Sequence, residues 1–209
     1  RVRSRKPEKA ISEIQKIAKE GIKEVVITGI HIASYGKDFK EEYRLIDLLE
    51  EINKIEGIQR IRLGSIEPLL INEDFMKRLV KLEKICHHFH LSLQSGCNET
   101  LKRMNRRYTT DDFRKIVSIL RKNIPEVALT TDVIVGFPGE TESDFKETLE
   151  VVKHCKYDGA YTFIFSPRVG TPAASMPDDT PLKEKEDRLH RLNELVNNYS
   201  LENNQKLLN

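Results

Sequence analysis

Polar and glycine residues follow the apolar segments of this chain at regular intervals, and their types could bind a polar ligand. They are Thr28 with Gly29, Ser65 with Glu67, Gln94, Asp132 with Gly136, and Ser166 to Arg168. Carboxylates accept hydrogen bonds from hydroxyl and ammonium groups, and glycine lets the backbone approach a ligand closely. We expect these segment ends to share one cleft, because barrel enzymes assemble their sites from several strand ends.

The apolar segments that position these residues alternate with helical patterns. β-Branched and aromatic residues predict strands at 24–28, 60–65, 89–94, 127–135 and 161–165. Helical spacing of apolar residues predicts helices at 7–20, 45–55, 73–80, 98–104, 110–120, 141–155 and from 181. Asn72, Thr110 and Thr141 are the predicted N-caps. This alternation favours parallel βαβ units, either in an open doubly wound sheet or in a piece of a (β/α) barrel.

Asp132 lies inside an apolar segment, where an unpaired charge would be expensive, so we expect it to face a ligand or a basic partner. The stretch from Val135 to Thr141 has two glycines and a proline, which allow a tight turn before a helix. That helix N-terminus could hold an anion, although an ordinary turn with a cap explains the stretch equally well. The sequence has no Walker lysine and no G-x-G-x-x-G, so neither of those nucleotide-binding modes is supported.

Glu67 and a basic segment are further candidates for ligand binding. Glu67 precedes Pro68, which favours an extended backbone, and its carboxylate could accept ribose hydroxyls or an ammonium group. A solvent-facing acid is the alternative. Arg106 and Arg107 close the basic segment, and a guanidinium binds carboxylate or phosphate in a bidentate manner. They could hold a small-molecule carboxylate or an RNA backbone, or lie on a solvated surface.

The composition is typical of a globular protein, with 38% hydrophobic residues and a net charge of +2. No apolar run reaches the roughly 18 residues of a membrane span, and no signal peptide opens the sequence. Cys86, Cys97 and Cys155 are too widely separated for a disulfide framework or a metal motif. His88 and His90 would lie on one strand face and His87 on the other, and no cysteine or carboxylate lies at a usable spacing beside them, which disfavours a metal site. We expect a cytoplasmic protein without a membrane segment and without metal ligands.

Five motifs, in order and over nearly the whole chain, resemble the strand-end motifs of radical S-adenosylmethionine (SAM) methylthiotransferases. They are Thr28-Gly-Ile-His-Ile-Ala-Ser-Tyr-Gly36, Arg62-Leu-Gly-Ser-Ile-Glu-Pro68, Leu93-Gln-Ser-Gly-Cys-Asn98 with Met104-Asn-Arg-Arg-Tyr-Thr109, Asp132-Val-Ile-Val-Gly-Phe-Pro-Gly-Glu-Thr141, and Phe165-Ser-Pro-Arg-Val-Gly-Thr-Pro172. The segments Tyr35–Asp38 and Leu63–Pro68 are most similar to the branch that acts on threonylcarbamoyladenosine in tRNA. The other branches act on isopentenyladenosine in tRNA or on an aspartate of a ribosomal protein.

The resemblance implies an α/β fold: a partial (β/α) TIM-like barrel of the radical SAM type, with about five parallel strands of a six-strand open barrel. It implies the SAM-binding core of an enzyme that places a methylthio group on C2 of N6-threonylcarbamoyladenosine, next to the anticodon. The tRNA anticodon loop would be the partner. The competing interpretations are a non-catalytic RNA-binding module and a different radical SAM enzyme with a small-molecule substrate.

The resemblance also implies roles for individual residues. Thr28 and Gly29 would lie near the SAM amino group. Its ribose and amino group would be faced by Ser65, Glu67 and Gln94. Its carboxylate would be bound by Arg106 or Arg107, and its adenine would be bordered by Asp132 to Gly136. The cofactors would be SAM and 4Fe-4S clusters. The C-x-x-x-C-x-x-C motif that holds the SAM-cleaving cluster is absent from this sequence, so no residue is predicted to be catalytic or to bind metal.

By the same resemblance, residues 1–209 would be a fragment of a barrel. The first barrel strand, the N-terminal methylthiotransferase domain and the C-terminal RNA-binding domain would be absent from it. We expect the chain alone to be unable to cleave SAM. We also expect the edge of its first strand to be exposed, which invites non-native strand pairing.

Overall fold

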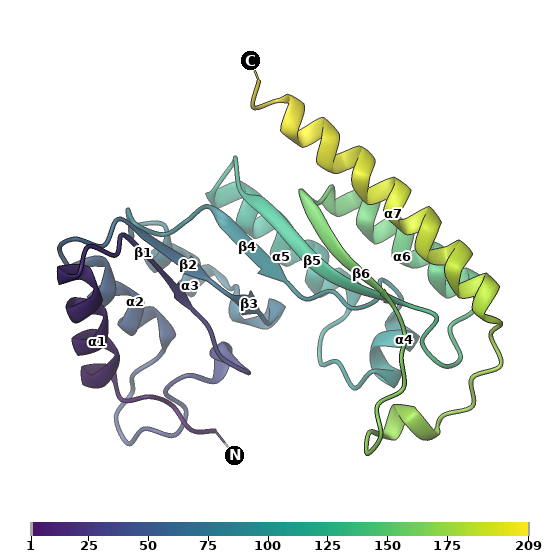
Figure 1. Cartoon of the computed structure of the whole chain (residues 1–209), viewed down its shortest axis with the longest axis horizontal. Coiled ribbons are helices and arrows are strands. Elements are labelled where there is room, and N and C mark those ends of the chain that lie inside the picture. The colour runs from purple at the N-terminus through teal and green to yellow at the C-terminus, as the bar shows by residue number, and fades with distance from the viewer. Residues whose placement is uncertain (1, 209) are drawn as a thin grey trace. The chain divides into compact units, whose positions relative to one another are not determined.

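The computed structural model describes residues 2–208, which form two compact units. The first unit contains the chain up to His90 together with Ile119–Val127, and the second contains Leu91–Ser118 and the chain from Ala128 onward. Both units consist of strands and helices in alternation (Figure 1), as the sequence predicts for an α/β protein. The described residues contain no helix that is long and apolar enough to cross a bilayer.

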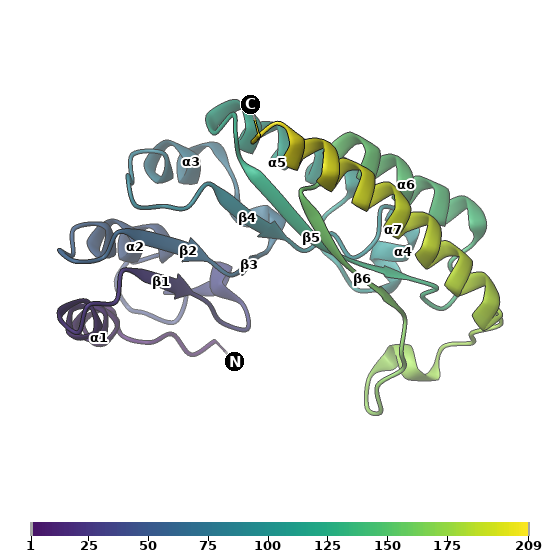
Figure 2. The same cartoon turned by 45° about the horizontal axis from the view of Figure 1, so that its top comes forward.

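The first unit begins with a helix and then alternates strands with helices. Its elements are α1 (Pro7–Lys19), β1 (Glu24–Ile27), the 3-10 helix η1 (Ile32–Ser34), α2 (Leu45–Asn53), β2 (Arg60–Leu63), β3 (Ser65–Ile66), η2 (Pro68–Leu70) and α3 (Glu73–Leu79), followed by β4 (His88–Leu91). Strands β1 and β2 lie side by side in Figure 2 and pair in parallel, with Val25 opposite Ile61. Among the described residues β2 is the only strand that pairs with β1, so the predicted open edge is present.

Apolar side chains from α2 and the strands form the core of the first unit. Leu49 and Ile52 on α2 are fully buried, as is Ile61 on β2. Burying a side chain of this size contributes roughly 1.5–3 kcal/mol. The start of α3 is as predicted, because the Asn72 side chain accepts the Phe75 N–H at 2.9 Å. This cap satisfies one of the donors that a helix start leaves unpaired.

The strand predicted over 60–65 is divided at Gly64 into β2 and β3. The Gly64 N–H donates to the Ile27 carbonyl oxygen at 2.9 Å, and a Cβ atom on Gly64 would lie only 2.9 Å from Thr28 Oγ1. The predicted strand is thus interrupted at Gly64, where the end of β1 lies close to the backbone and leaves no room for a side chain. The prediction of one continuous strand is wrong for this reason.

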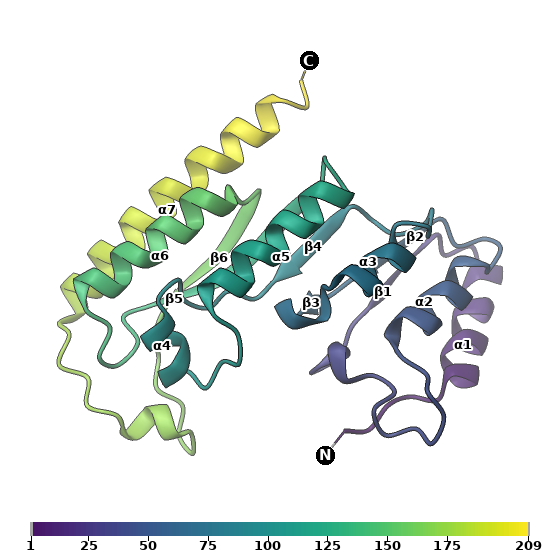
Figure 3. The same ribbon diagram turned by 180° about the vertical axis from the view of Figure 1, so that it is seen from behind.

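The second unit is built on two long parallel strands. Its elements are α4 (Asn98–Arg103), α5 (Thr110–Asn123, which begins in this unit), β5 (Ala128–Val135), α6 (Glu142–Cys155), β6 (Gly159–Ile164), η3 (Pro172–Ser175) and α7 (Leu182–Gln205). Strands β5 and β6 pair in parallel from Thr130–Gly159 to Val135–Ile164. Helices α6 and α7 lie along one another in Figures 1 and 3, and α7 packs on β6.

Alternate residues of β5 face opposite sides. Leu129, Thr131, Val133 and Val135 are buried, whereas the residues between them are partly exposed. The N-cap of α6 is as predicted: Thr141 Oγ1 accepts the Asp144 N–H at 3.1 Å, and Asp144 accepts the Thr141 N–H at 3.0 Å. This reciprocal pair fixes the point at which the turn after β5 enters its helix.

Several element boundaries from residue 89 onward differ from the predictions, and three of them have a clear cause. The strand predicted over 89–94 ends at Leu91, because Gln94 has a positive φ of 68° that an extended strand does not allow. Strand β6 begins at Gly159 rather than 161, because Gly159 already pairs with Thr130. The cap of α5 is Thr109, not Thr110: Thr109 Oγ1 accepts the Asp112 N–H at 3.1 Å.

Gly96 tests the packing of α6 in the second unit. Its N–H donates to Thr148 Oγ1 at 2.9 Å, and a Cβ atom there would lie 2.4 Å from Thr148 Cα. We expect Gly96→Ala to lower the free energy of unfolding by about 2–3 kcal/mol, because backbone must move to accept the methyl group. The control is Gly159→Ala, whose added Cβ meets its nearest atom at 3.7 Å. Urea unfolding of both variants measures the effect, and equal stabilities would contradict this packing.

Candidate functional site

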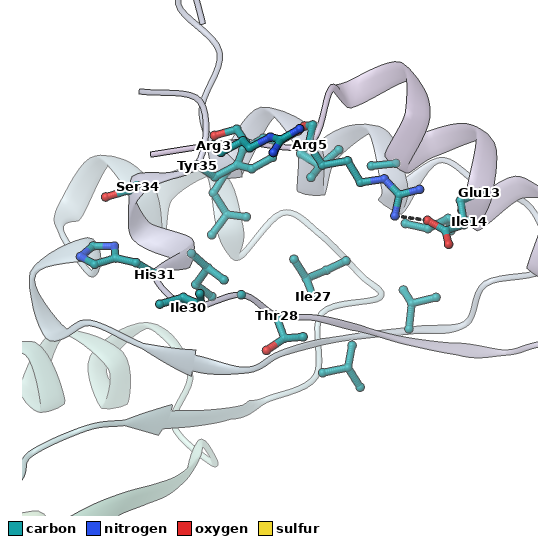
Figure 4. Close-up of a pocket in the computed structure, with 18 of the residues that line it drawn as sticks. Arg3, Arg5, Glu13, Ile14, Ile27, Thr28, Ile30, His31, Ser34 and Tyr35 are labelled. Atoms are coloured by element: carbon teal, nitrogen blue, oxygen red, sulfur yellow. Dashed lines mark hydrogen bonds and ion pairs between the residues drawn. The ribbon is translucent and has the colours of Figure 1, made fainter. Parts of the chain in front are cut away.

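The first two predicted site residues line a cavity in the first unit. Thr28 and Gly29 belong to the wall of a cavity of about 920 Å³ beside β1 and α1 (Figure 4). Apolar side chains such as Ile14 and Ile27 form much of its lining. The cavity follows β1, the strand whose second edge has no partner strand among residues 2–208.

Polar contacts close the outer side of this cavity. Arg5 forms an ion pair with Glu13 on α1, and the Tyr35 hydroxyl donates to the Arg5 carbonyl oxygen at 2.8 Å (Figure 4). Burial, with nearby carboxylates, raises the pKa of Tyr35 to about 12, so the hydroxyl stays protonated and remains a donor. The segment 2–5 is thereby fixed over the cavity.

Ser65 and Glu67 are exposed and are not part of the cavity wall. Glu67 is extended, as predicted, with φ −65° and ψ 132°. Its carboxylate lies 2.7 Å from His31 Nε2, and both side chains are nearly half exposed. Water screens such a pair, so it fixes the Glu67 side chain only weakly. Nothing in the residues around His31 predicted this contact.

Gln94 and Asp132 meet in the second unit. The Gln94 N–H donates to the Asp132 carbonyl oxygen at 2.8 Å, and the Gln94 carbonyl accepts the Ile134 N–H at 2.9 Å. Gln94 is 8% exposed, whereas Asp132 lies on the partly exposed side of β5. The backbone of Gln94 thus pairs with β5 beside Asp132, and the Asp132 residue lies on the partly exposed face of that strand.

Gly136 begins a tight turn, and the absence of a side chain there leaves room for a side chain of α7. Its φ is +68°, and a Cβ atom would lie 2.6 Å from the Lys185 Cγ and Cδ atoms. Its N–H donates to Glu140 Oε1 at 2.9 Å, which closes the turn. The space beside its Cα atom is therefore filled by α7, so glycine is required here whether or not a ligand borders the turn.

Arg188 on α7 holds the same turn, and sequence reasoning missed it. Its Nη1 atom donates to the Glu140 carbonyl oxygen at 3.0 Å and to Glu140 Oε1 at 3.1 Å. The two side chains are only 2% and 1% exposed. Burial raises the pKa of the Glu140 carboxyl, while the Gly136 N–H and Arg188 oppose that shift. The pair therefore ties α7 to the end of β5 through a buried charge.

The three arginines of the basic segment have different surroundings. Arg103 Nη2 donates to the Gly139 carbonyl oxygen at 3.1 Å and to Thr100 Oγ1 at 2.9 Å, so it fastens α4 to the turn. Arg106 and Arg107 are exposed on the loop after α4. Arg106 and Arg107 stay predictions as carboxylate or phosphate partners.

One group of potential metal ligands lies close together among residues 2–208: Cys97, Asp144 and Glu147. Burial raises the pKa of the Cys97 thiol, which disfavours the thiolate that a metal needs. Asp144 already accepts the Thr141 N–H and a contact from Arg103 at 3.4 Å. The group already takes part in hydrogen bonds within the protein, and it contains one cysteine only. This group therefore lacks the three cysteines that would hold a 4Fe-4S cluster.

Comparison with known proteins places this geometry in a family. Residues 1–152 match the model of the radical SAM superfamily. The chain is 48% identical, over 208 residues, to the tRNA-2-methylthio-N(6)-dimethylallyladenosine synthase of Caldicellulosiruptor saccharolyticus, covering all of this chain and 44% of that protein. It is 46% identical over 204 residues to the synthase of the same name from Clostridium botulinum (strain Loch Maree), covering 98% of this chain and 45% of that protein. The chain thus spans less than half the length of these relatives.

Solved structures show the same fold at low sequence identity. Methylornithine synthase superposes with a TM-score of 0.60 at 15% identity, covering 88% of this chain and 53% of that chain. Archaeal Elp3 from Methanocaldococcus infernus gives 0.54 at 16%, covering 93% and 48%. These matches confirm the predicted α/β partial barrel of the radical SAM type. These relatives are named for dimethylallyladenosine, whereas the sequence motifs favoured the threonylcarbamoyladenosine branch.

The buried pair makes a quantitative prediction for α7. Arg188→Met leaves the Glu140 carboxylate buried without its partner, so we expect a loss of about 3–5 kcal/mol in the free energy of unfolding at neutral pH. Adding Glu140→Gln should recover part of the loss, because no unpaired charge remains. The matched control is Arg191→Met on the same helix, whose partner Glu142 is 41% exposed; it should cost about 1 kcal/mol or less.

Lowering the pH should reduce the difference in the free energy of unfolding between Arg188→Met and the wild type. Burial raises the folded-state pKa of Glu140 above 4.5, and losing Arg188 raises it further. The Glu140 carboxyl of the folded variant then binds a proton more readily than it does in the unfolded chain. The free energy of unfolding of the variant therefore falls as the pH rises from the unfolded-state pKa of Glu140 to its higher folded-state pKa. Denaturant unfolding across that pH range measures this. A gap that stays constant would contradict a buried Glu140 charge.

Proposed function

This chain belongs to the radical SAM superfamily, and on that premise we propose that it is the SAM-binding core of a tRNA methylthiotransferase. The nucleoside that the longer protein modifies is N6-dimethylallyladenosine, the isopentenyladenosine of tRNA, next to the anticodon. The observation that carries the proposal is the 48% identity over the whole chain to a synthase named for that product. A superfamily match alone would not distinguish among the reactions that the fold supports.

The contribution of this chain is binding and orientation. SAM together with a reduced 4Fe-4S cluster supplies the radical that removes a hydrogen atom from the substrate. Cys86, Cys97 and Cys155 do not have the sequence spacing of a cluster motif, so in our proposal the cluster has other ligands. The residues of this chain hold the SAM molecule and the RNA in the orientation that this chemistry requires.

The second unit provides the side chains that fit SAM. The zwitterionic methionine end of SAM needs an acceptor for its ammonium group and a cation for its carboxylate. Asp132 is a partly exposed carboxylate, and Arg106 or Arg107 supplies an exposed guanidinium. The Gly136 turn, held by Glu140 and Arg188, borders the adenine. Five further residues stay predicted SAM contacts: Thr28, Gly29, Ser65 and Glu67 in the first unit, and Gln94 in the second.

Analysis of tRNA nucleosides tests the proposed product. The intact gene that encodes this chain is expressed in a bacterium that lacks its own 2-methylthio modification enzymes, and hydrolysed tRNA is analysed by mass spectrometry. We expect 2-methylthio-N6-dimethylallyladenosine to appear. Appearance of the threonylcarbamoyl nucleoside instead would overturn the choice of substrate, and the absence of any methylthio nucleoside would overturn the function.

Calorimetric titration of the 209-residue chain with SAM tests the role of Asp132. We expect Asp132→Asn to weaken SAM binding about tenfold or more, because a hydrogen bond to a charged group contributes roughly 1.5–3 kcal/mol. The matched control is Asp179→Asn, which changes an exposed aspartate outside the strands and should leave the affinity unchanged. Equal affinity of both variants would remove Asp132 from the site.

A further inference from the structure

The chain between β6 and α7 forms a segment that lies outside the sheet and the long helices of the second unit. Residues 166–177, which we call the strap, include the 3-10 helix η3, and Figure 1 shows them extending away from the strands. The residues of the strap are exposed except for Ala173 and Met176, which are half-buried. Val169 is fully exposed. The strap therefore has little contact with the body of the second unit.

Local hydrogen bonds give the strap a shape of its own. The N–H and the hydroxyl of Thr171 both donate to the Arg168 carbonyl oxygen, at 3.1 and 2.7 Å. Gly170 has a φ of +86°, which this turn requires. The Met176 N–H donates to the Ala173 carbonyl oxygen at 3.3 Å at the end of η3. The hydrogen bonds that the structure describes for the strap all lie within it, so the strap can change position without losing them.

Both ends of the strap are attached to the turn that follows β5. At the first end, the rings of Phe165 and Phe137 are in edge-to-face contact, with their centroids 5.0 Å apart. At the second end, Lys185 Nζ donates to Asp178 Oδ2 at 2.5 Å. The aliphatic part of Lys185 lies against Gly136, where a Cβ atom would meet it at 2.6 Å. The strap thus begins and ends beside one turn, through two different kinds of contact.

The two attachments differ in how readily they separate. Phe165 continues β6, because its N–H donates to the Val135 carbonyl oxygen at 2.9 Å. The second attachment is an ion pair, in which the Lys185 side chain is 8% exposed and the Asp178 side chain is 27% exposed. Separation leaves a buried ammonium group without its partner, so the pair favours the attached position. Water reaches the Asp178 carboxylate, which makes this end the one that can detach.

We propose that the strap is a hinged lid and that the Lys185–Asp178 ion pair is the latch that holds it closed. When the pair separates, the strap moves as a body about Phe165 and the residues before α7. The strap follows the carboxyl end of β6 and is attached beside that of β5, and barrel enzymes assemble their sites at such strand ends. Its position therefore controls access to that end of the second unit. The inference goes beyond the proposed function and does not depend on the ligand.

Distances between two spin labels test the latch on the full 209-residue chain. One label is attached at Val169→Cys on the strap, and the other at Ser143→Cys, an exposed position on α6. Cys86 is replaced by Ser, and Cys97 and Cys155 are buried, so only the two introduced thiols react. Double electron–electron resonance then measures the distance between strap and α6. We expect a single distance when the latch is intact.

Breaking the latch should populate a second position of the strap. Lys185→Met keeps the apolar contact with Gly136 but cannot bind Asp178, so we expect a second distance to appear beside the first. Asp178→Asn removes the charge of the other partner and should produce the same second distance. The double variant should equal the single variants, because substitutions of two partners in one contact are not additive.

Matched controls separate the latch from general effects of charge. Lys183→Met and Asp179→Asn change exposed neighbours of the two partners and should keep the single distance. Amide hydrogen exchange, followed by NMR, distinguishes a hinge from unfolding of the strap. The N–H groups of Ala174 and Met176 should exchange as slowly in Lys185→Met as in the wild type, because their bonds are local.

Three results would overturn the inference. One is an unchanged single distance in both latch variants, and another is a wild type that already shows both distances in the proportions of the variants. The third is faster exchange of the strap amides in Lys185→Met, because the strap then unfolds instead of moving as a body. The product of the tRNA assay is unaffected by these outcomes, so the proposed function stands or falls separately.

Discussion

In the second unit the guanidinium of Arg188 is buried against the carboxylate of Glu140, and this contact fixes much of what surrounds it. Moving two charges out of water is expensive, so the pair is tolerated only with additional hydrogen bonds. Gly136 donates to the same carboxylate, and Arg188 also donates to the Glu140 carbonyl oxygen. The turn after β5 cannot open without leaving a buried charge unpaired. The accessible face that carries Asp132 is thereby anchored at its carboxyl end.

Features with local causes could be predicted from the sequence. The caps at Asn72 and Thr141 depend on residues within one turn of the helix start, and both are present. The alternation of strands and helices predicted the α/β class because apolar periodicity is a local property. The cap of α5 was misplaced by one residue because Thr109 and Thr110 are chemically equivalent, and only the choice of partner for Asp112 distinguishes them.

Features with distant causes could not be predicted. Nothing near Gln94 signals its left-handed backbone, which places its peptide groups in register with Asp132 and Ile134 on β5. The requirement for glycine at Gly136 comes from Lys185, far along the chain. Short segments such as Leu63–Pro68 favoured one substrate branch, whereas relatives that are similar over the whole chain are named for another.

The ion pair also determines when the second unit can form during protein synthesis. Arg188 follows Glu140 by 48 positions, so at usual elongation rates it emerges from the ribosome about 2–10 s later. Until then the turn after β5 has its carboxylate but not its counterion, and the carboxylate remains in water. During those seconds β6 has already been synthesised, but α7, the helix that packs on it, is not yet complete.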